Sequence, residues 1–497
     1  MMKDFLSDQD NMKVNVLAMI IQRGEYVKLS EISERLSLSA KTVRSIILSL
    51  EENPYIEEQS IDINYNKVGK MKSVKIINGS LTDASFYYLE KSILFLMIKE
   101  LFLKGVLNKK KFCSDYFISP ATFSRNRTKL KSTFLSFGLC LTKQNRLDGP
   151  ELKIRNFYFL LFYNASSKWL FSREMKHFLN HSLLAHFPGL VKIDPGKKQM
   201  LRLAIYIIIV RNNQNCPSNK TLKLHLEGSL KELYVTIESY FSDSFPYFEN
   251  KIAEAQYLFI FILKNQIKKI DEEELNIYEP LKEHNEVMSF FAKEIITHFF
   301  IEKKESEKKL IPNISLYFIY LESSFFDIAR FQYININEFY FQRNQFETKL
   351  RQSTEKIAQK LYQTFPIFFE EIEHKNEKNR KAIVNSMVSF IYNLKIKYEP
   401  PLSQPVVSIY VQNSKEYAEE IIQHKIERVF SNRVEIRKHY HPDIDLYVTD
   451  KEYETPNSKA KRIYVPNYRD SFTMHKLFEV IEHLIEEKVS SEPLEYM

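Results

Sequence analysis

Four polar side chains near residue 125 have the types and the spacing that could read DNA. They lie at positions i, i+3, i+4 and i+7 and would share one face of a helix: Thr122, Arg125, Asn126 and Lys129. An arginine can donate two hydrogen bonds to guanine, and an asparagine can pair in the same way with adenine. The spacing therefore predicts a helix face that enters the major groove, while Arg127 and Lys131 are expected to reach backbone phosphates.

The residues around these side chains predict the helix that must carry them. Ser119 suits an N-cap and Pro120 the first helical position, so a helix is expected from residue 120 to about 134. A preceding helix is expected from about 108 to 116, with the turn at 117 and 118. On the second helix the apolar residues share a separate face: Phe123, Leu130 and Phe134. This pattern is typical of a helix-turn-helix.

Positive charge is concentrated in the same part of the chain. The formal net charge of the whole chain is only +8. Residues 1–170 carry 26 Lys and Arg against 17 Asp and Glu, and all of this excess arises after residue 100. Three consecutive lysines, Lys109, Lys110 and Lys111, begin the first predicted helix. A localised basic surface indicates nucleic-acid binding that should weaken as salt rises.

A second helix-turn-helix pattern occurs closer to the first residue. Helices are expected over residues 12–22, 29–36 and 40–52, with Ser39 as the N-cap of the third. Alternating apolar residues at 61–64 and 74–76 predict a two-stranded wing with three lysines at its tip, Lys67, Lys70 and Lys72. The outward residues of the third helix are Lys41, Thr42, Arg44 and Ser45. Residues 1–100 hold 13 basic and 14 acidic residues, so this module is expected to bind DNA more weakly.

The stretch from 85 to 157 completes the module that contains Arg125. A single apolar helix is predicted over residues 85–103. A short hairpin, with strands at 139–142 and 146–147 and a turn at 144–145, would form a second wing. The phrase Leu147-x-Gly149-x-Glu151-x-x-Ile154-Arg155-x-Phe157 then ends the hairpin and starts another helix.

Two tandem helix-turn-helix patterns, followed by this phrase and a long helical region, resemble the Mga/AtxA family of virulence and metabolism regulators of Gram-positive bacteria. The resemblance implies a cytoplasmic transcription factor, an activator rather than a repressor, with a mainly α, multidomain fold. It implies winged helix-turn-helix modules at 1–80 and 81–170 and all-α phosphotransferase-regulation (PRD) domains at 171–285 and 286–398. A C-terminal α/β domain at 402–497 would resemble the EIIB component of sugar phosphotransferase systems.

An internal repeat supports the two helical domains independently. The pattern Phe-Pro-x-Phe occurs at residues 245–248 and again at 365–368, each time at the end of a long amphipathic helix. Histidines in these domains could accept phosphate from a phosphocarrier protein, because an imidazole nitrogen is nucleophilic near neutral pH. The candidates are His181, His225, His298 and His374, of which His225 and His298 are preferred. For each of them, a surface or core histidine without such a role is the simpler alternative.

After Pro400 and Pro401 the pattern changes to strands that alternate with helices, which predicts a small α/β domain with a largely parallel sheet. Strands are expected at 406–411, 434–437, 444–448 and 463–465, and helices at 415–430 and 474–488. The EIIB resemblance implies a phosphorylated cysteine after the first strand, but residues 411–414 contain none. This domain is therefore expected to mediate interaction or dimerisation rather than phosphotransfer.

The composition argues against several other classes of function. Nine glycines among 497 residues leave little scope for glycine-rich phosphate loops, and no catalytic constellation, metal-ligand spacing or cofactor motif is recognisable. The three cysteines, Cys113, Cys140 and Cys216, lack CxxC spacing and are expected to be buried and reduced in the cytoplasm. Neither a signal peptide nor a membrane-spanning run is recognisable.

The preferred interpretation is a homodimeric regulator without enzymatic activity that binds promoter regions of double-stranded DNA. One alternative is an RNA-binding antiterminator, which would share the PRD domains but begin with a small β-rich RNA-binding domain. Another alternative is a phosphotransferase-system component, which the missing cysteine disfavours.

Overall fold

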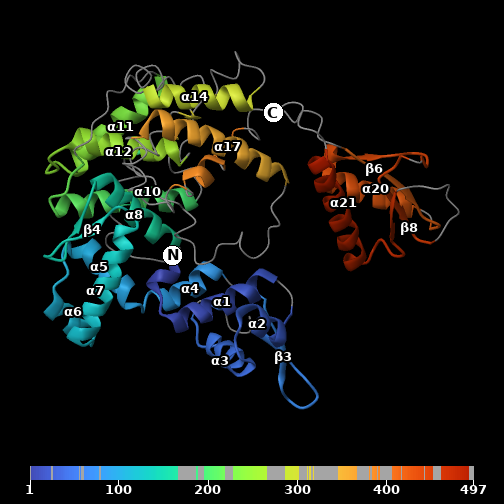
Figure 1. Ribbon diagram of the computed structural model, residues 1–497, viewed down its shortest axis with the longest axis horizontal. Coiled ribbons are helices and arrows are strands. Elements are labelled where there is room, and N and C mark those ends of the chain that lie inside the picture. Colours follow the sequence, from blue (N-terminus) through green and yellow to red (C-terminus); the bar gives the residue numbers. More distant parts are fainter. Residues whose placement is uncertain are drawn as a thin grey trace. The chain divides into compact units, whose positions relative to one another are not determined.

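The structure is a computed structural model, and a large part of the 497-residue chain is described in it. The described residues are 2–23, 26–54, 56, 61–77, 80–165, 179, 186–187, 195–218, 228–265, 286–300, 310–311, 313–314, 317, 345–366, 380, 383–388, 390–391, 394, 406–415, 417–441, 443–451 and 460–491. These residues are mainly helical, as predicted, and Figure 1 shows the small sheets among the helices. The chain divides into two compact units: residues 1–292 lie in the first, and residues 387–497, called the C-terminal unit below, lie in the second.

The first module contains the three predicted helices and the predicted pair of antiparallel strands. Its helices are α1 (Asp8–Arg23), α2 (Leu29–Leu36) and α3 (Ala40–Leu50), and a short 3-10 helix, η1 (Met2–Phe5), precedes them. The wing strands β2 (Ile61–Tyr65) and β3 (Met71–Ile76) pair antiparallel. A third strand, β1 (Val27–Lys28), pairs with β3 and was not predicted, because two residues are too few to show alternation.

The second module runs through five helices and a hairpin. The elements are α4 (Leu81–Leu89), α5 (Ile93–Lys104), α6 (Lys109–Asp115), α7 (Pro120–Leu135), β4 (Cys140–Leu141), β5 (Leu147–Asp148) and α8 (Glu151–Ala165). The predicted helix pair, hairpin and following helix are confirmed. The single helix predicted over 85–103 is wrong, because the chain leaves the helical conformation at Ser92 and starts α5 there. Both flanking segments are apolar, so hydropathy alone does not show the break.

The two helix-turn-helix motifs repeat one another at an interval of 80 residues. Ser37 and Phe117 occupy the turns with left-handed φ values of 53° and 52°. The following amide bonds back to the first helix in both copies, at 3.0 Å for Leu38 and 3.1 Å for Ile118. The N-cap hydroxyls of Ser39 and Ser119 each accept a hydrogen bond of 3.0 Å, from the amides of Thr42 and Thr122. The same local chemistry therefore builds both motifs.

Phe117 combines two unfavourable features, since it has a left-handed backbone and its side chain is 95% exposed. A residue with a Cβ pays about 1–2 kcal/mol for this conformation, whereas glycine adopts it freely. We expect Phe117→Gly to raise the free energy of unfolding of the module by about 1 kcal/mol. Thermal unfolding measures the change. Ser37→Gly, at the equivalent position of the first module, is the matched comparison, and it should also raise the free energy of unfolding. A lower stability of Phe117→Gly would show that the ring makes a stabilising contact.

Five longer helices are described between residues 195 and 366. They are α10 (Pro195–Asn213), α11 (Gly228–Ser244), α12 (Lys251–Lys264), α14 (Glu286–Phe299) and α17 (Gln345–Thr364). At the start of each copy of the predicted repeat, the phenylalanine amide bonds to a carbonyl four residues earlier, from Phe245 to Phe241 and from Phe365 to Leu361. The division into domains at 171–285 and 286–398 stays a prediction.

The C-terminal unit contains the predicted parallel sheet. Strands β6 (Val407–Gln412), β7 (Val434–Ile436), β8 (Leu446–Thr449) and β9 (Lys461–Tyr464) are all parallel, in the order β7-β6-β8-β9. Helices α20 (Ala418–Phe430) and α21 (Ser471–Ser491) pack their apolar residues into one cluster with the sheet. The predicted alternation of strands and helices is therefore confirmed.

Three expectations from the composition can be compared with the described residues. The cysteines are free, but each is half-buried rather than buried, because they lie at the margins of the packed core. No described helix has the length and apolar character needed to cross a membrane. Within the same residues, no group of three or more His, Cys, Asp or Glu side chains is placed to hold a metal ion.

Candidate nucleic-acid interface

Helix α7 is held by one apolar face, and this determines which of its side chains remain outside. Phe123, Leu130 and Phe134 are buried, as predicted. The ring of Phe123 lies 5.6 Å from that of Phe112 on α6, and the ring of Phe134 lies 5.5 Å from that of Phe157 on α8. Edge-to-face packing of this kind fixes both ends of the helix.

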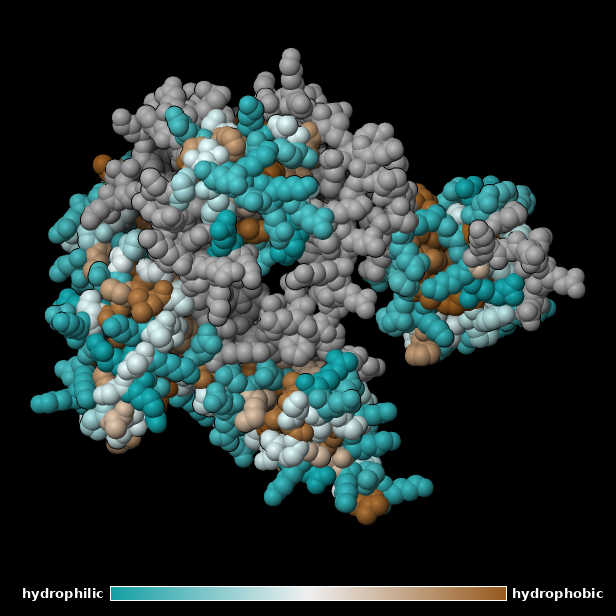
Figure 2. Space-filling model, viewed as in Figure 1, coloured by the Kyte–Doolittle hydropathy of each residue, from teal (hydrophilic) through white to brown (hydrophobic). Residues whose placement is uncertain are grey.

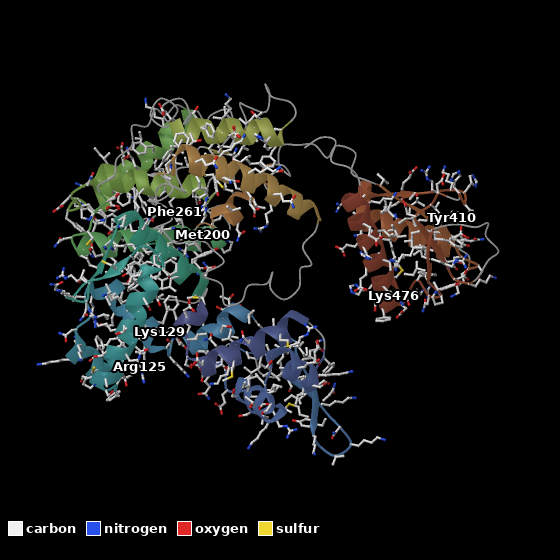
Figure 3. The ribbon with its side chains drawn as sticks, in the orientation of Figure 1. Arg125, Lys129, Met200, Phe261, Tyr410 and Lys476 are labelled. Atoms are coloured by element: carbon white, nitrogen blue, oxygen red, sulfur yellow. The ribbon has the colours of Figure 1, made fainter. Side chains whose placement is uncertain are left out.

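The predicted reading face is present on α7, although its members differ in exposure. Arg125, Lys129 and Lys131 are exposed, whereas Thr122 and Asn126 are half-buried. Figure 3 labels Arg125 and Lys129 on this helix. The amide nitrogen of Asn126 donates a 2.9 Å hydrogen bond to the carbonyl of Thr122, so part of its hydrogen-bonding capacity is used within the helix. All five residues lie on α7, and the exposed cations of the predicted face are Arg125 and Lys129.

Arg127 has partners inside the protein. Its Nη2 donates a 3.0 Å hydrogen bond to the carbonyl of Thr142, and its Nε donates to the side chain of Asn145. Asn145, which has a left-handed φ of 58°, also donates 3.1 Å to the carbonyl of Leu107. Arg127 thus joins α7 to the hairpin turn, and the expectation that it reaches a phosphate stays a prediction. Sequence spacing could not reveal these contacts, because they join residues 15 and 18 positions apart.

The hairpin of the second module adds two basic residues that the sequence interpretation did not single out. Lys143 and Arg146 are exposed on either side of the turn that Arg127 holds. Basic residues beside a predicted turn were the signal that could have identified them. Lys109, Lys110 and Lys111 are exposed at the start of α6, where Nζ of Lys109 donates 3.2 Å to the hydroxyl of Ser124 on α7.

The first module presents a similar but less basic surface. Lys41, Arg44 and Ser45 on α3 are exposed, and Thr42 is half-buried. At the wing, Asn66 accepts hydrogen bonds from the amides of Val68 and Lys70 at 3.0 and 2.8 Å, which closes the turn. Figure 2 shows hydrophilic side chains around a hydrophobic group at the end of this hairpin, where Val68 is 79% exposed. Lys67, Lys70 and Lys72 are all exposed.

Of the four candidate histidines, one lies within the described residues. His298 is exposed on α14, with Nδ1 2.9 Å from the carbonyl oxygen and 3.6 Å from the carboxylate of Glu294. His181, His225 and His374 lie outside the described residues. His186, which was not predicted, lies 3.3 Å from Asp243.

The loop after β6 is where the expected EIIB resemblance would require a phosphorylated cysteine, and residues 411–414 contain none. The amide of Asn413 donates 2.8 Å to Glu419, and the amide of Ser414 donates 3.2 Å to Asp450. Carboxylates therefore occupy the hydrogen-bond donors that an anionic ligand would need at the carboxyl ends of β6 and β8.

Comparison with known proteins connects the second module to a family. Residues 77–162 match the family model described as the Mga helix-turn-helix domain, and this span contains α6, α7 and the hairpin. A search of curated proteins finds no match. The domain suggests a DNA-binding transcriptional regulator. The match therefore supports membership of the chain in the Mga/AtxA family of regulators, through the helix-turn-helix module between residues 77 and 162.

Proposed function

We propose that the chain activates transcription by binding promoter DNA, mainly through α7 and more weakly through α3. The observation that carries the proposal is the exposed cationic face of α7, with Arg125 and Lys129, inside the matched domain. Arg125 would contact base edges, most favourably guanine. Lys109, Lys110, Lys111 and Lys131 would neutralise phosphates, with Lys143 and Arg146 on the hairpin extending the charged surface.

Binding to a short duplex tests this function directly. A duplex selected by the full chain from a random-sequence pool would be labelled, and its affinity measured by fluorescence anisotropy at several salt concentrations. We expect the logarithm of the affinity to fall linearly with the logarithm of the salt concentration, by about 0.9 per neutralised phosphate. Failure to enrich any sequence, together with affinity that does not depend on salt, would exclude the proposal.

The regulation that we propose involves the helical region and the C-terminal unit. PRD-like domains would receive phosphate on His225 or His298 from a phosphotransferase-system phosphocarrier, with His181 and His374 as further candidates. His298 is exposed, as a phosphoacceptor must be. The C-terminal unit would support a homodimer, since the loop after β6 contains no thiolate for phosphotransfer.

Phosphorylation can be tested on the purified full chain with a phosphocarrier and its phosphate-donating enzyme. We expect a phosphate-dependent shift on a Phos-tag gel that is lost in the His225→Ala/His298→Ala double variant. The His186→Ala variant is the control, because this histidine was not predicted to accept phosphate. A shift that persists unchanged in the double variant would refute the assignment of these two histidines.

A further inference from the structure

Helix α8 connects α7, the proposed recognition helix, to α10 and α12, which belong to the helical region after residue 195. On one side the ring of Phe157 lies 5.5 Å from Phe134 on α7 and 5.1 Å from Phe137 just beyond it. Two residues earlier, Arg155 contacts Glu254 on α12. All these elements belong to one compact unit with a continuous apolar core. A displacement of α8 would therefore be felt at both ends of this connection.

Arg155 is the most completely bonded side chain of this connection. The side chains of Arg155 and Glu254 are both 0% exposed. The guanidinium donates from two nitrogens to the Glu254 carboxylate, with Nη2 at 2.9 Å from Oε1. It also donates 2.8 Å to Glu151 and 3.1 Å to the carbonyl of Cys216. Burial opposes the charged form, but the bonds to Glu254 and Glu151 raise the pKa of Arg155 above its ordinary value, so the charge is retained.

A second arginine extends the network to α10 and α5. Arg211 on α10 donates to both carboxylate oxygens of Glu151, at 2.9 and 2.7 Å, and donates 2.8 Å to Gln214. The amide of Gln214 in turn donates 2.6 Å to the carbonyl of Phe102 on α5. Two arginines and two glutamates balance in charge, which the low-dielectric interior requires. Their directional bonds hold α8 against α10 and α12.

Glu254 holds further groups of the helical region. Its carboxylate accepts from the side chain of Asn212 at 2.8 Å and from the amide of Ser218 at 2.9 Å. These bonds tie Asn212 and Ser218 to the same carboxylate that Arg155 binds.

We propose that Arg155 is a positioning residue for the recognition helix. Through Glu254 and Glu151 it fixes α8 on α10 and α12, and through Phe157 the position of α8 determines that of α7. A shift of α10 or α12 would then change the presentation of Arg125 and Lys129. This inference rests on the proposed function, because it names the route by which the helical region regulates the same interface.

A paired substitution separates positioning from simple stabilisation. The double variant Arg155→Met/Glu254→Gln removes both charges and keeps an acceptor for Asn212 and Ser218, and an uncharged replacement of a buried ion pair can preserve stability. The control is Lys104→Met/Glu100→Gln, which removes a more exposed ion pair on α5. The readouts on the full chain are hydrogen exchange of the α7 amides, the thermal midpoint, and affinity for the selected duplex.

We expect the Arg155→Met/Glu254→Gln variant to fold, to exchange its α7 amides at least tenfold faster, and to bind the duplex about tenfold more weakly. In the control variant, the exchange rates of the α7 amides and the duplex affinity should stay within twofold of the wild type, and the thermal midpoint within two degrees. Wild-type exchange and affinity in the double variant would overturn the proposal. Faster exchange spread evenly over the whole unit would also overturn it, because the role would then be structural only.

A second variant is used if the double variant does not fold. Phe157→Leu keeps the ion network and removes the ring contacts to Phe134 and Phe137. It should speed exchange in α7 and leave α10 and α12 unchanged, and equal effects in all three helices would overturn the proposal. Hydrogen exchange is measured without DNA. If the wild-type chain binds no duplex, the proposed function is rejected, but the exchange data still test whether α8 positions α7.

Discussion

Replacing Arg125 by alanine is expected to lower the affinity for the selected duplex roughly 10- to 100-fold, because a bidentate arginine–guanine contact contributes about 1–3 kcal/mol. Arg44→Ala in the first module should weaken binding less. The internal repeat gives a structural reason for this order. Position 45 is equivalent to position 125, and it holds Ser45, which has no guanidinium fork to offer. The first module therefore lacks an arginine at the corresponding place on its helix.

The measurement is a titration of wild type, Arg125→Ala and Arg44→Ala at one fixed salt concentration. Lys131→Ala serves as the matched control on α7, because it should reduce the affinity for all sequences alike and lower the salt slope by about 1. Arg125→Ala should instead reduce the preference for the selected sequence. A larger loss for Arg44→Ala than for Arg125→Ala would reverse the proposed roles of the two modules.

Sequence reasoning located α7 because its signals are local. The Ser119 hydroxyl caps the helix, Pro120 occupies its first position, and Phe123 and Leu130 fall on the buried face. Each of these features involves residues a few positions apart, so the spacing is informative. The parallel sheet of the C-terminal unit was predictable for the same reason, because its alternating segments are separated by clear breaks.

Contacts between distant residues were not predictable. Arg155 was recognised as part of a phrase, but its main partner Glu254 lies 99 positions away, and no periodicity connects them. For Arg127 the sequence predicted the hairpin but not the bonds that the guanidinium makes to Thr142 and Asn145 in its turn. In both cases the partner lies 15 or more positions away in the sequence, which spacing within one helix does not show.

The phrase that carries the resemblance also has a physical explanation. Gly149 has a φ of 149°, and a Cβ there would approach the Leu139 side chain to 2.8 Å, so the close turn before α8 requires glycine. Glu151 and Arg155 supply the ion network, and Phe157 packs on α7. The phrase therefore encodes the connection of α7 to α12 and α10, rather than the proposed DNA-binding surface.

The connection predicts the largest effect on stability. Glu254→Ala leaves the buried guanidinium of Arg155 with Glu151 as its remaining carboxylate partner, while Arg211 also bonds to Glu151. Removal of one member of a buried ion pair costs about 3–5 kcal/mol, because the remaining charge stays buried without compensation. We therefore expect the free energy of opening at α8, measured by native-state hydrogen exchange, to fall by about that amount.

The matched control is Glu100→Ala, which breaks the ion pair with Lys104 on α5. The side chain of Lys104 is 42% exposed, so water replaces the lost partner and the expected cost is at most about 1 kcal/mol. Equal losses for the two variants would mean that water reaches the guanidinium of Arg155 once Glu254 is gone. The connection between α8 and α12 would then be too loosely packed to set the position of α7, and the positioning role of Arg155 would fail with it.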